Sequence, residues 1–102
     1  VEWFGAAVAL EGDRLVVGAP KSTTGRAYVF DRASDGTWVE QAIFQPADLG
    51  SADDFGYAVA VRGDTVAVSA VLHDKPVLNQ GAIYIFEESP TGWVQSAKIG
   101  SN

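Results

Sequence analysis

Three short groups of residues have types that could support binding or chemistry, and the first is a set of carboxylates. Asp48, Asp53 and Asp54 lie within the segment QPADLGSADD, residues 45–54. Carboxylate oxygens are ligands for hard cations such as calcium, so these residues are weak candidates for a metal site. A solvated linker in which aspartates cap turns accounts for them more simply, because spacing alone does not bring ligands together. We expect the linker and no bound cofactor.

The second group contains the only histidine, His73, followed by Asp74 and Lys75. A catalytic dyad needs a nucleophile and a third group that orients the base, and no serine here stands in a GxSxG elbow. The chain has no cysteine, which removes thiol catalysis and Cys-ligated zinc. We therefore expect a protein that is not an enzyme. His73, Asp74 and Lys75 are kept as candidate ligand-binding residues in a surface loop.

The third group consists of the tryptophans Trp3, Trp38 and Trp93. Aromatic rings at a surface can stack on sugars, so a glycan-binding protein is one alternative function. Trp38 and Trp93 occupy equivalent positions in a repeat described next, which favours packing for these two. Trp3 has no equivalent tryptophan and remains a ligand-binding candidate.

The elements that would position these residues come from an internal repeat. Phe4–Ala19 and Phe55–Ala70 align at an offset of 51, and nine of their sixteen positions are identical. A period near 50 residues indicates a repeat architecture. Each copy has Gly-Asp at the middle of a short polar interruption, at Gly12-Asp13 and Gly63-Asp64, which predicts a two-residue hairpin turn.

Apolar residues alternate with small ones on both sides of this turn, so neither face of the predicted strands is polar and both must be covered. Two further apolar runs follow in each copy. The pattern predicts an all-β fold with two units, residues 1–47 and 48–102, each a four-stranded antiparallel propeller blade. The expected third and fourth strands are Gly25–Phe30 and Trp38–Phe44 in the first unit, and Gly81–Phe86 and Trp93–Ile99 in the second.

These motifs resemble the FG-GAP repeat family, which includes the integrin α propeller and many bacterial surface proteins. Phe4-Gly5 and Phe55-Gly56 match "FG", while Gly18-Ala19-Pro20 matches "GAP", which is Ser69-Ala70-Val71 in the second unit. The resemblance implies an extracellular or cell-surface β-propeller that takes part in adhesion or ligand recognition. It does not extend to calcium, because the first turn of each unit lacks the DxDxDG loop and has too few oxygen ligands.

The second turn, Arg62-Gly63-Asp64, spells the tripeptide that integrins recognise. The first unit has Glu11-Gly12-Asp13 at the same place, so a turn explains both copies and ligand mimicry explains one. Adhesion through this tripeptide would require the turn to be exposed at one end of a propeller.

The net charge and the uncovered apolar faces of two blades indicate which partners to expect. Seven basic against thirteen acidic residues give a net charge of −6, and no basic run occurs, which argues against nucleic acid and a membrane surface. Two blades leave apolar faces uncovered, so we expect head-to-tail contacts with copies of the chain or with adjacent repeats. A ring of identical chains would contain six or eight blades. The absence of Met and the short segments outside the two units also fit an engineered or excised blade pair with no ligand.

Overall fold

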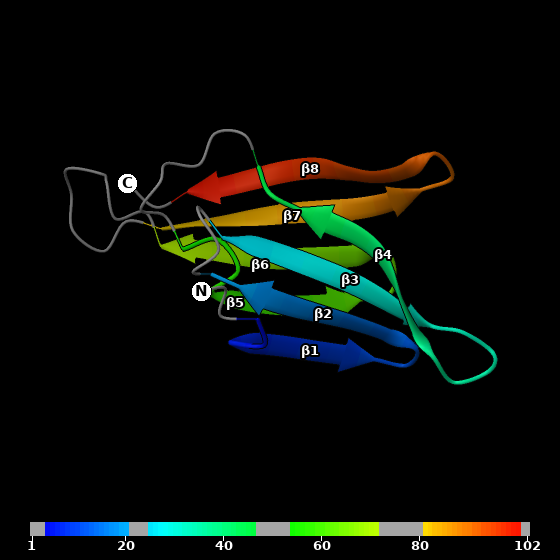
Figure 1. Cartoon of the computed structure of the whole chain (residues 1–102). Coiled ribbons are helices and arrows are strands. Elements are labelled where there is room, and N and C mark those ends of the chain that lie inside the picture. The colour runs from blue at the N-terminus through cyan, green and yellow to red at the C-terminus, as the bar shows by residue number, and fades with distance from the viewer. Residues whose placement is uncertain (1–3, 21–24, 47–53, 72–80, 101–102) are drawn as a thin grey trace.

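The computed structural model describes residues 4–20, 25–46, 54–71 and 81–100. These residues form two four-stranded antiparallel sheets that lie face to face (Figure 1), with strand orders β1-β2-β3-β4 and β5-β6-β7-β8. The strands are β1 Ala7–Glu11, β2 Arg14–Ala19, β3 Arg26–Arg32, β4 Trp38–Phe44, β5 Ala58–Arg62, β6 Thr65–Val71, β7 Gly81–Ser89 and β8 Gly92–Gly100. The described part of the chain contains no helix, and so none long and apolar enough to span a membrane. The expected boundary between residues 47 and 48 lies outside the described residues.

The first turn of each sheet is the predicted two-residue hairpin. Glu11 pairs with Arg14 across one turn, and Arg62 pairs with Thr65 across the other. The glycine that opens each turn has φ of +57°, a left-handed conformation that residues with a side chain rarely adopt. Both Gly-Asp turns are therefore confirmed, and they lie at corresponding corners of the two sheets.

The repeat extends to irregular details. The pairing of the third and fourth strands shifts after Val29 in the first sheet and after Ile85 in the second, which are equivalent positions. The backbone N–H of Arg32 donates to Asp13, and that of Glu88 donates to Asp64 in the same way. Arg32 and Glu88 are thus structural equivalents, which matters for the charges discussed below.

Each sheet has two apolar faces of different kinds. The aromatic face carries Phe4, Leu15, Val17, Tyr28 and Phe30 in the first sheet, and Phe55, Val66, Val68, Tyr84 and Phe86 in the second. The aliphatic face is the opposite side. It carries Val16, Gly18, Ala27, Val29 and, at its edge, Phe44 in the first sheet, and Ala67, Ser69, Ile83, Ile85 and Ile99 in the second.

The main core lies where the aromatic face of the second sheet packs on the aliphatic face of the first. Phe44 and Phe86 stack with ring centroids 4.0 Å apart, and Phe55 meets Tyr84 edge to face at 5.3 Å. Such ring pairs contribute about 1 kcal/mol beyond the area they bury. This contact joins the two sheets into one unit.

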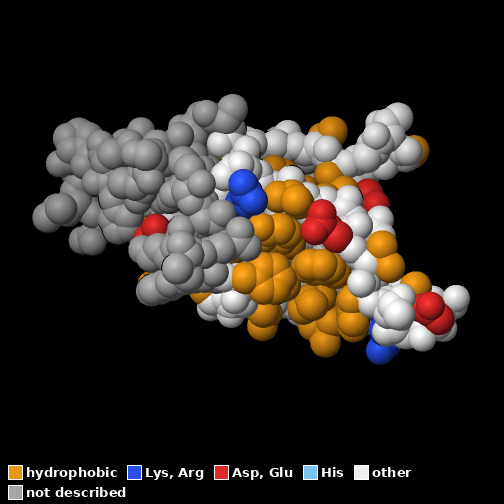
Figure 2. Space-filling view, in the orientation of Figure 1, with side chains coloured by type: hydrophobic (Ala, Val, Ile, Leu, Met, Phe, Trp, Pro, Cys, Tyr) orange, Lys and Arg blue, Asp and Glu red, His pale blue; other side chains and the backbone are white. Residues whose placement is uncertain are grey.

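The aromatic face of the first sheet has no sheet against it among the described residues. Phe4 is 53% exposed, whereas its equivalent Phe55 is fully buried, and Val8 and Leu10 of β1 are also exposed. Figure 2 shows hydrophobic side chains gathered over the front sheet. β1 is one of the more exposed strands, because no other sheet of the described residues covers its aromatic side.

Candidate functional site at the junction of the two sheets

The Phe-Gly motif of the second unit packs backbone to backbone against the first sheet. A Cβ added to Gly18 would lie 2.1 Å from the carbonyl oxygen of Gly56, and one added to Gly25 would lie 2.0 Å from that of Phe55. Gly56 itself has a φ of +98° and approaches the carbonyl of Arg26. Gly18, Gly25 and Gly56 are therefore required for the two sheets to approach this closely.

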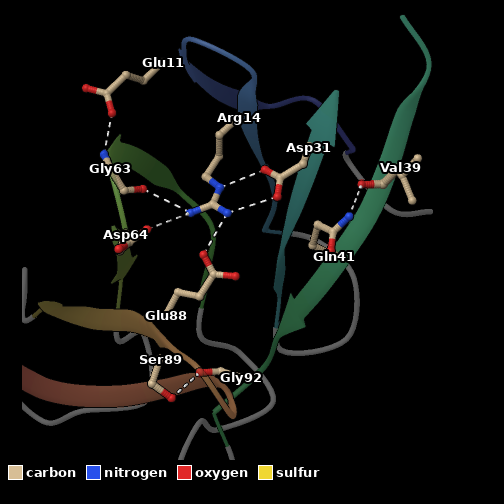
Figure 3. Close-up of polar contacts among 10 residues, drawn as sticks. All are labelled: Glu11, Arg14, Asp31, Val39, Gln41, Gly63, Asp64, Glu88, Ser89 and Gly92. Atoms are coloured by element: carbon tan, nitrogen blue, oxygen red, sulfur yellow. Dashed lines mark hydrogen bonds and ion pairs between the residues drawn. The ribbon is translucent and has the colours of Figure 1, made fainter. Parts of the chain in front are cut away.

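Arg14 is the polar centre of the junction (Figure 3). Its Nε and Nη2 donate to the two carboxylate oxygens of Asp31 at 2.8 and 3.0 Å, a bidentate pair within the first sheet. Nη2 also donates to Glu88 of the second sheet at 2.9 Å, and Nη1 donates to the carbonyl of Gly63 at 3.1 Å. Asp64 lies 3.8 Å from Nη1. One guanidinium thus donates four hydrogen bonds, two to Asp31 of its own sheet and two to the second sheet.

The surroundings of Arg14 strengthen these bonds. Its side chain is only 16% exposed, while those of Asp31 and Glu88 are about one third exposed. The hydrogen bond with Asp31, followed by that with Glu88, raises the pKa of Arg14 above its already high usual value, against the effect of burial. The guanidinium also lies over the ring of Trp93, 4.9 Å from its centroid, where it gains a cation–π contact.

The turn that spells Arg62-Gly63-Asp64 takes part in this junction. The N–H of Gly63 donates to the carboxylate of Glu11, and its carbonyl accepts from Arg14. Both backbone groups of the central glycine therefore have partners in the first sheet, while the side chain of Asp64 remains 79% exposed. The tripeptide has a structural role that the sequence did not indicate.

Most of the candidate ligand-binding residues fall outside the described residues: Trp3, Asp48, Asp53, His73, Asp74 and Lys75. Asp54 is described and is buried, with its backbone N–H donating to Val71 at 3.1 Å. In the part of the chain that the structure describes, no three acidic or histidine side chains come together as a metal site.

The two described tryptophans differ although they occupy equivalent positions. Trp93 packs against the main core, as the packing interpretation predicts. Trp38 is 40% exposed and lies under Arg32, whose guanidinium carbon is 5.5 Å from the ring centroid. The difference arises because Trp93 borders the covered aromatic face and Trp38 borders the free one.

The aliphatic face of the second sheet is open and hollowed. A groove of about 190 Å³ is lined by Ala58, Val59, Ala60, Ala67, Ser69 and Ile83. A second groove, of about 340 Å³, continues from Ser69 to Ile99 and Gly100. Their walls are almost wholly apolar, which suits packing against another apolar surface better than recognition of a polar small molecule.

Two stacked sheets with the same strand order, turns and bulges define a repeat protein built from propeller-like β-sheet units. The FG-GAP repeat family matches residues 2–30 and 38–86, well over half of the chain, and the chain belongs to this family. The first match runs from β1 into β3 of the first sheet, and the second runs from β4 of the first sheet into β7 of the second. No curated protein matches the chain.

Proposed function

We propose that the chain is a non-enzymatic scaffold unit of an extracellular β-propeller, in which its two sheets are consecutive blades and further blades complete the ring. One observation carries this proposal. The contact between the two sheets joins unlike faces, aromatic on aliphatic, and among the described residues no further sheet lies against the outer face of either sheet, although Val17 and Tyr28 are buried within the outer aromatic face. A contact between unlike surfaces can repeat indefinitely, and it closes into a ring when its rotation allows.

The apolar content of the free faces supports a covering partner. Phe4, Leu10, Ile83 and Ile99 are all more than 40% exposed, and they extend over both outer faces. Burying apolar surface gives about 25 cal/mol per Å², so leaving two sheet faces in water would be a large loss. Identical chains would close only with an even number of blades, six from three chains or eight from four.

Any ligand would bind at the end of the ring that holds the connections from β2 to β3 and from β6 to β7. The two blades differ in length there, since the offset between equivalent residues rises from 51 before this connection to 56 after it. The opposite end holds the Gly-Asp turns, whose backbone is used between sheets. Adhesion or glycan recognition by the first end can be tested with glycan and extracellular-matrix protein arrays.

The particle mass in solution tests the scaffold proposal. Native mass spectrometry and light scattering of the purified chain should give three or four times the chain mass of 10.8 kDa. A folded monomer at high micromolar concentration would contradict assembly from identical chains.

A further inference from the structure

The two free faces carry the two halves of the contact that already joins the sheets. On the aromatic face of the first sheet, each aromatic residue of the buried equivalent is retained: Phe4 for Phe55, Tyr28 for Tyr84 and Phe30 for Phe86. On the aliphatic face of the second sheet, Ile83 and Ile85 take the places of Ala27 and Val29. One free face is therefore aromatic and the other aliphatic, like the two faces that meet within the chain. The charged residues at the edges of these faces indicate how two copies would align.

In the existing junction, a cation of the first sheet lies between two carboxylates. Arg14 bonds Asp31 of its own sheet and Glu88 of the other. On the free aliphatic face the equivalent of Arg14 is Thr65, which pairs in register with Glu87, just as Arg14 pairs with Asp31. At the position of Arg14 this rim has therefore lost a cation and kept its carboxylate, and the basic residue next in register is Arg62, the partner of Thr65.

The free aromatic face supplies the missing cation. The equivalent of Glu88 there is Arg32, established by the shared backbone hydrogen bonds of these two residues. Stacking a further blade with the geometry of the existing junction would thus bring Arg32 of one copy to Glu87 of another. The junction between copies would thus also have a cation beside its carboxylate. That cation would come from the aromatic face, whereas Arg14 of the existing junction lies on the aliphatic face.

A second pair of charges follows the same rule. Glu11 meets the turn of Gly63 and Asp64 within the chain, and its equivalent on the free aliphatic face is Arg62. The turn on the free aromatic face contains Asp13. Arg62 would therefore face Asp13, with opposite signs again. In the isolated chain Asp13 bonds Arg32 at 2.7 Å, in a pair whose two side chains are 49% and 69% exposed and which is therefore weak enough to rearrange.

We propose that the aromatic face of the first sheet of a second copy docks on the aliphatic face of the second sheet, with Arg32 paired to Glu87 and Asp13 paired to Arg62. This rests on the proposed propeller scaffold and names its partner and its polar contacts. Charges of opposite sign at a rim mainly select the partner and its register, while the apolar centre supplies the affinity.

The junction within the chain and the proposed junction between copies differ at one position, and this difference has a measurable consequence. Gly18 allows the Gly56 carbonyl to approach, whereas its equivalent on the free face is Ser69, whose side chain occupies that space. The Phe-Gly segment of the docking copy must shift by about 1 Å to restore ordinary contact distance. Among the described residues no atom lies within 4 Å of a Cβ on Gly5, which leaves room for this shift. The contact between copies is therefore looser than the one within the chain.

Charge reversal tests the pairing. We expect Glu87→Arg and Arg32→Glu, each alone, to weaken assembly about ten-fold or more in sedimentation velocity, because each places like charges together. The chain carrying both substitutions restores the opposite signs and should assemble like the wild type. Ser34→Arg, in the exposed β3–β4 turn, is a control that adds one positive charge, half the change made by Glu87→Arg, and should leave assembly unchanged. Circular dichroism on dilute samples establishes that each variant is folded.

Ser69 gives an independent readout with opposite sign. Ser69→Gly should tighten assembly several-fold by allowing closer approach, although glycine within a strand slightly destabilises the isolated chain. If the wild type assembles but the single charge reversals have no effect, or the double variant does not recover, the pairing is wrong while the scaffold proposal stands. If the wild type is monomeric, docking between copies is wrong, and the ring of the scaffold proposal would have to be completed by further repeats.

Discussion

The contribution of Arg14 to the junction can be measured by replacing it with methionine. Arg14→Met keeps a long apolar side chain over Trp93 and removes every hydrogen bond of the guanidinium. Asp31 and Glu88 are then left facing each other across the two sheets without a cation between them. The substitution therefore removes attraction and leaves the repulsion between two partly buried carboxylates.

The size of the effect follows from exposure. An ion pair in full contact with water contributes up to about 1 kcal/mol, and breaking a fully buried one costs about 3–5 kcal/mol. Arg14 is 16% exposed and its two partners about one third, so the loss lies between these limits, at about 2 kcal/mol. For a chain of this size that lowers the melting temperature by roughly 10 °C.

Thermal and urea unfolding, followed by circular dichroism at a concentration where the variants share one assembly state, would measure this loss. Arg14→Lys is the matched control, since it keeps the charge but cannot form the bidentate pair with Asp31, and should lose about half as much. A double-mutant cycle with Glu88→Gln should give a coupling of about 1 kcal/mol across the sheets. If Arg14→Met and Arg14→Lys both unfold within about 0.5 kcal/mol of the wild type, apolar packing alone holds the junction.

Three further predictions concern single positions. Gly25→Ala should cost more than about 3 kcal/mol or prevent folding, because its Cβ would lie 2.0 Å from the Phe55 carbonyl oxygen. Gly36→Ala is the control, since Gly36 has a similar φ and no described atom within 4 Å of its Cβ, and should cost about 1 kcal/mol. Equal losses in urea unfolding would refute the steric argument. Phe55→Ala should cost about 3–5 kcal/mol and Phe4→Ala less than about half of that in dilute samples, with similar losses contradicting the difference in their burial. NMR titration should place the pKa of Asp35 below its ordinary value of 3.8, because a side-chain and a backbone hydrogen bond from Thr37 stabilise its charged form. The small stabilisation of the fold by this turn is present above the unfolded pKa and is lost as pH falls through the folded pKa. A measured pKa at or above 3.8 would refute the turn geometry.

Sequence reasoning could predict the strands because periodicity and turn chemistry act locally. Trp38–Phe44 forms a strand with the expected ends, and both Gly-Asp turns have the expected length. The pattern also predicts that apolar strand faces are covered, which is seen where Gly18 of the first sheet meets Gly56. These features need no knowledge of what lies across the junction.

The role of Arg14 could not be predicted in the same way. Its partners Asp31 and Glu88 are 17 and 74 residues away in sequence, and they come together only after the register of two sheets and their stacking are fixed. A signal was nevertheless present, because Arg14 is one of the few polar positions at which the two copies differ, with Thr65 as its equivalent. Comparison of the copies at rim positions, rather than core positions, would have identified it.

The differences between the copies also specify which blades can stack. If the aromatic face of a first sheet met the aliphatic face of another first sheet, Arg32 would lie near Arg14, and the two cations would compete for Asp31. If two second sheets met in that way, Glu87 would lie near Glu88 across Thr65, and Arg62 would be the cation next in register for these two carboxylates and Asp64. The alternating order instead places Arg14 with Asp31 and Glu88 at one junction, and Arg32 with Glu87 and Arg62 with Asp13 at the other. Repulsion in the wrong pairings is how repeated surfaces of similar shape achieve specificity. A chain with two identical blades would lose this discrimination, so the divergence of the rim is a condition for ordered stacking of the two sheets.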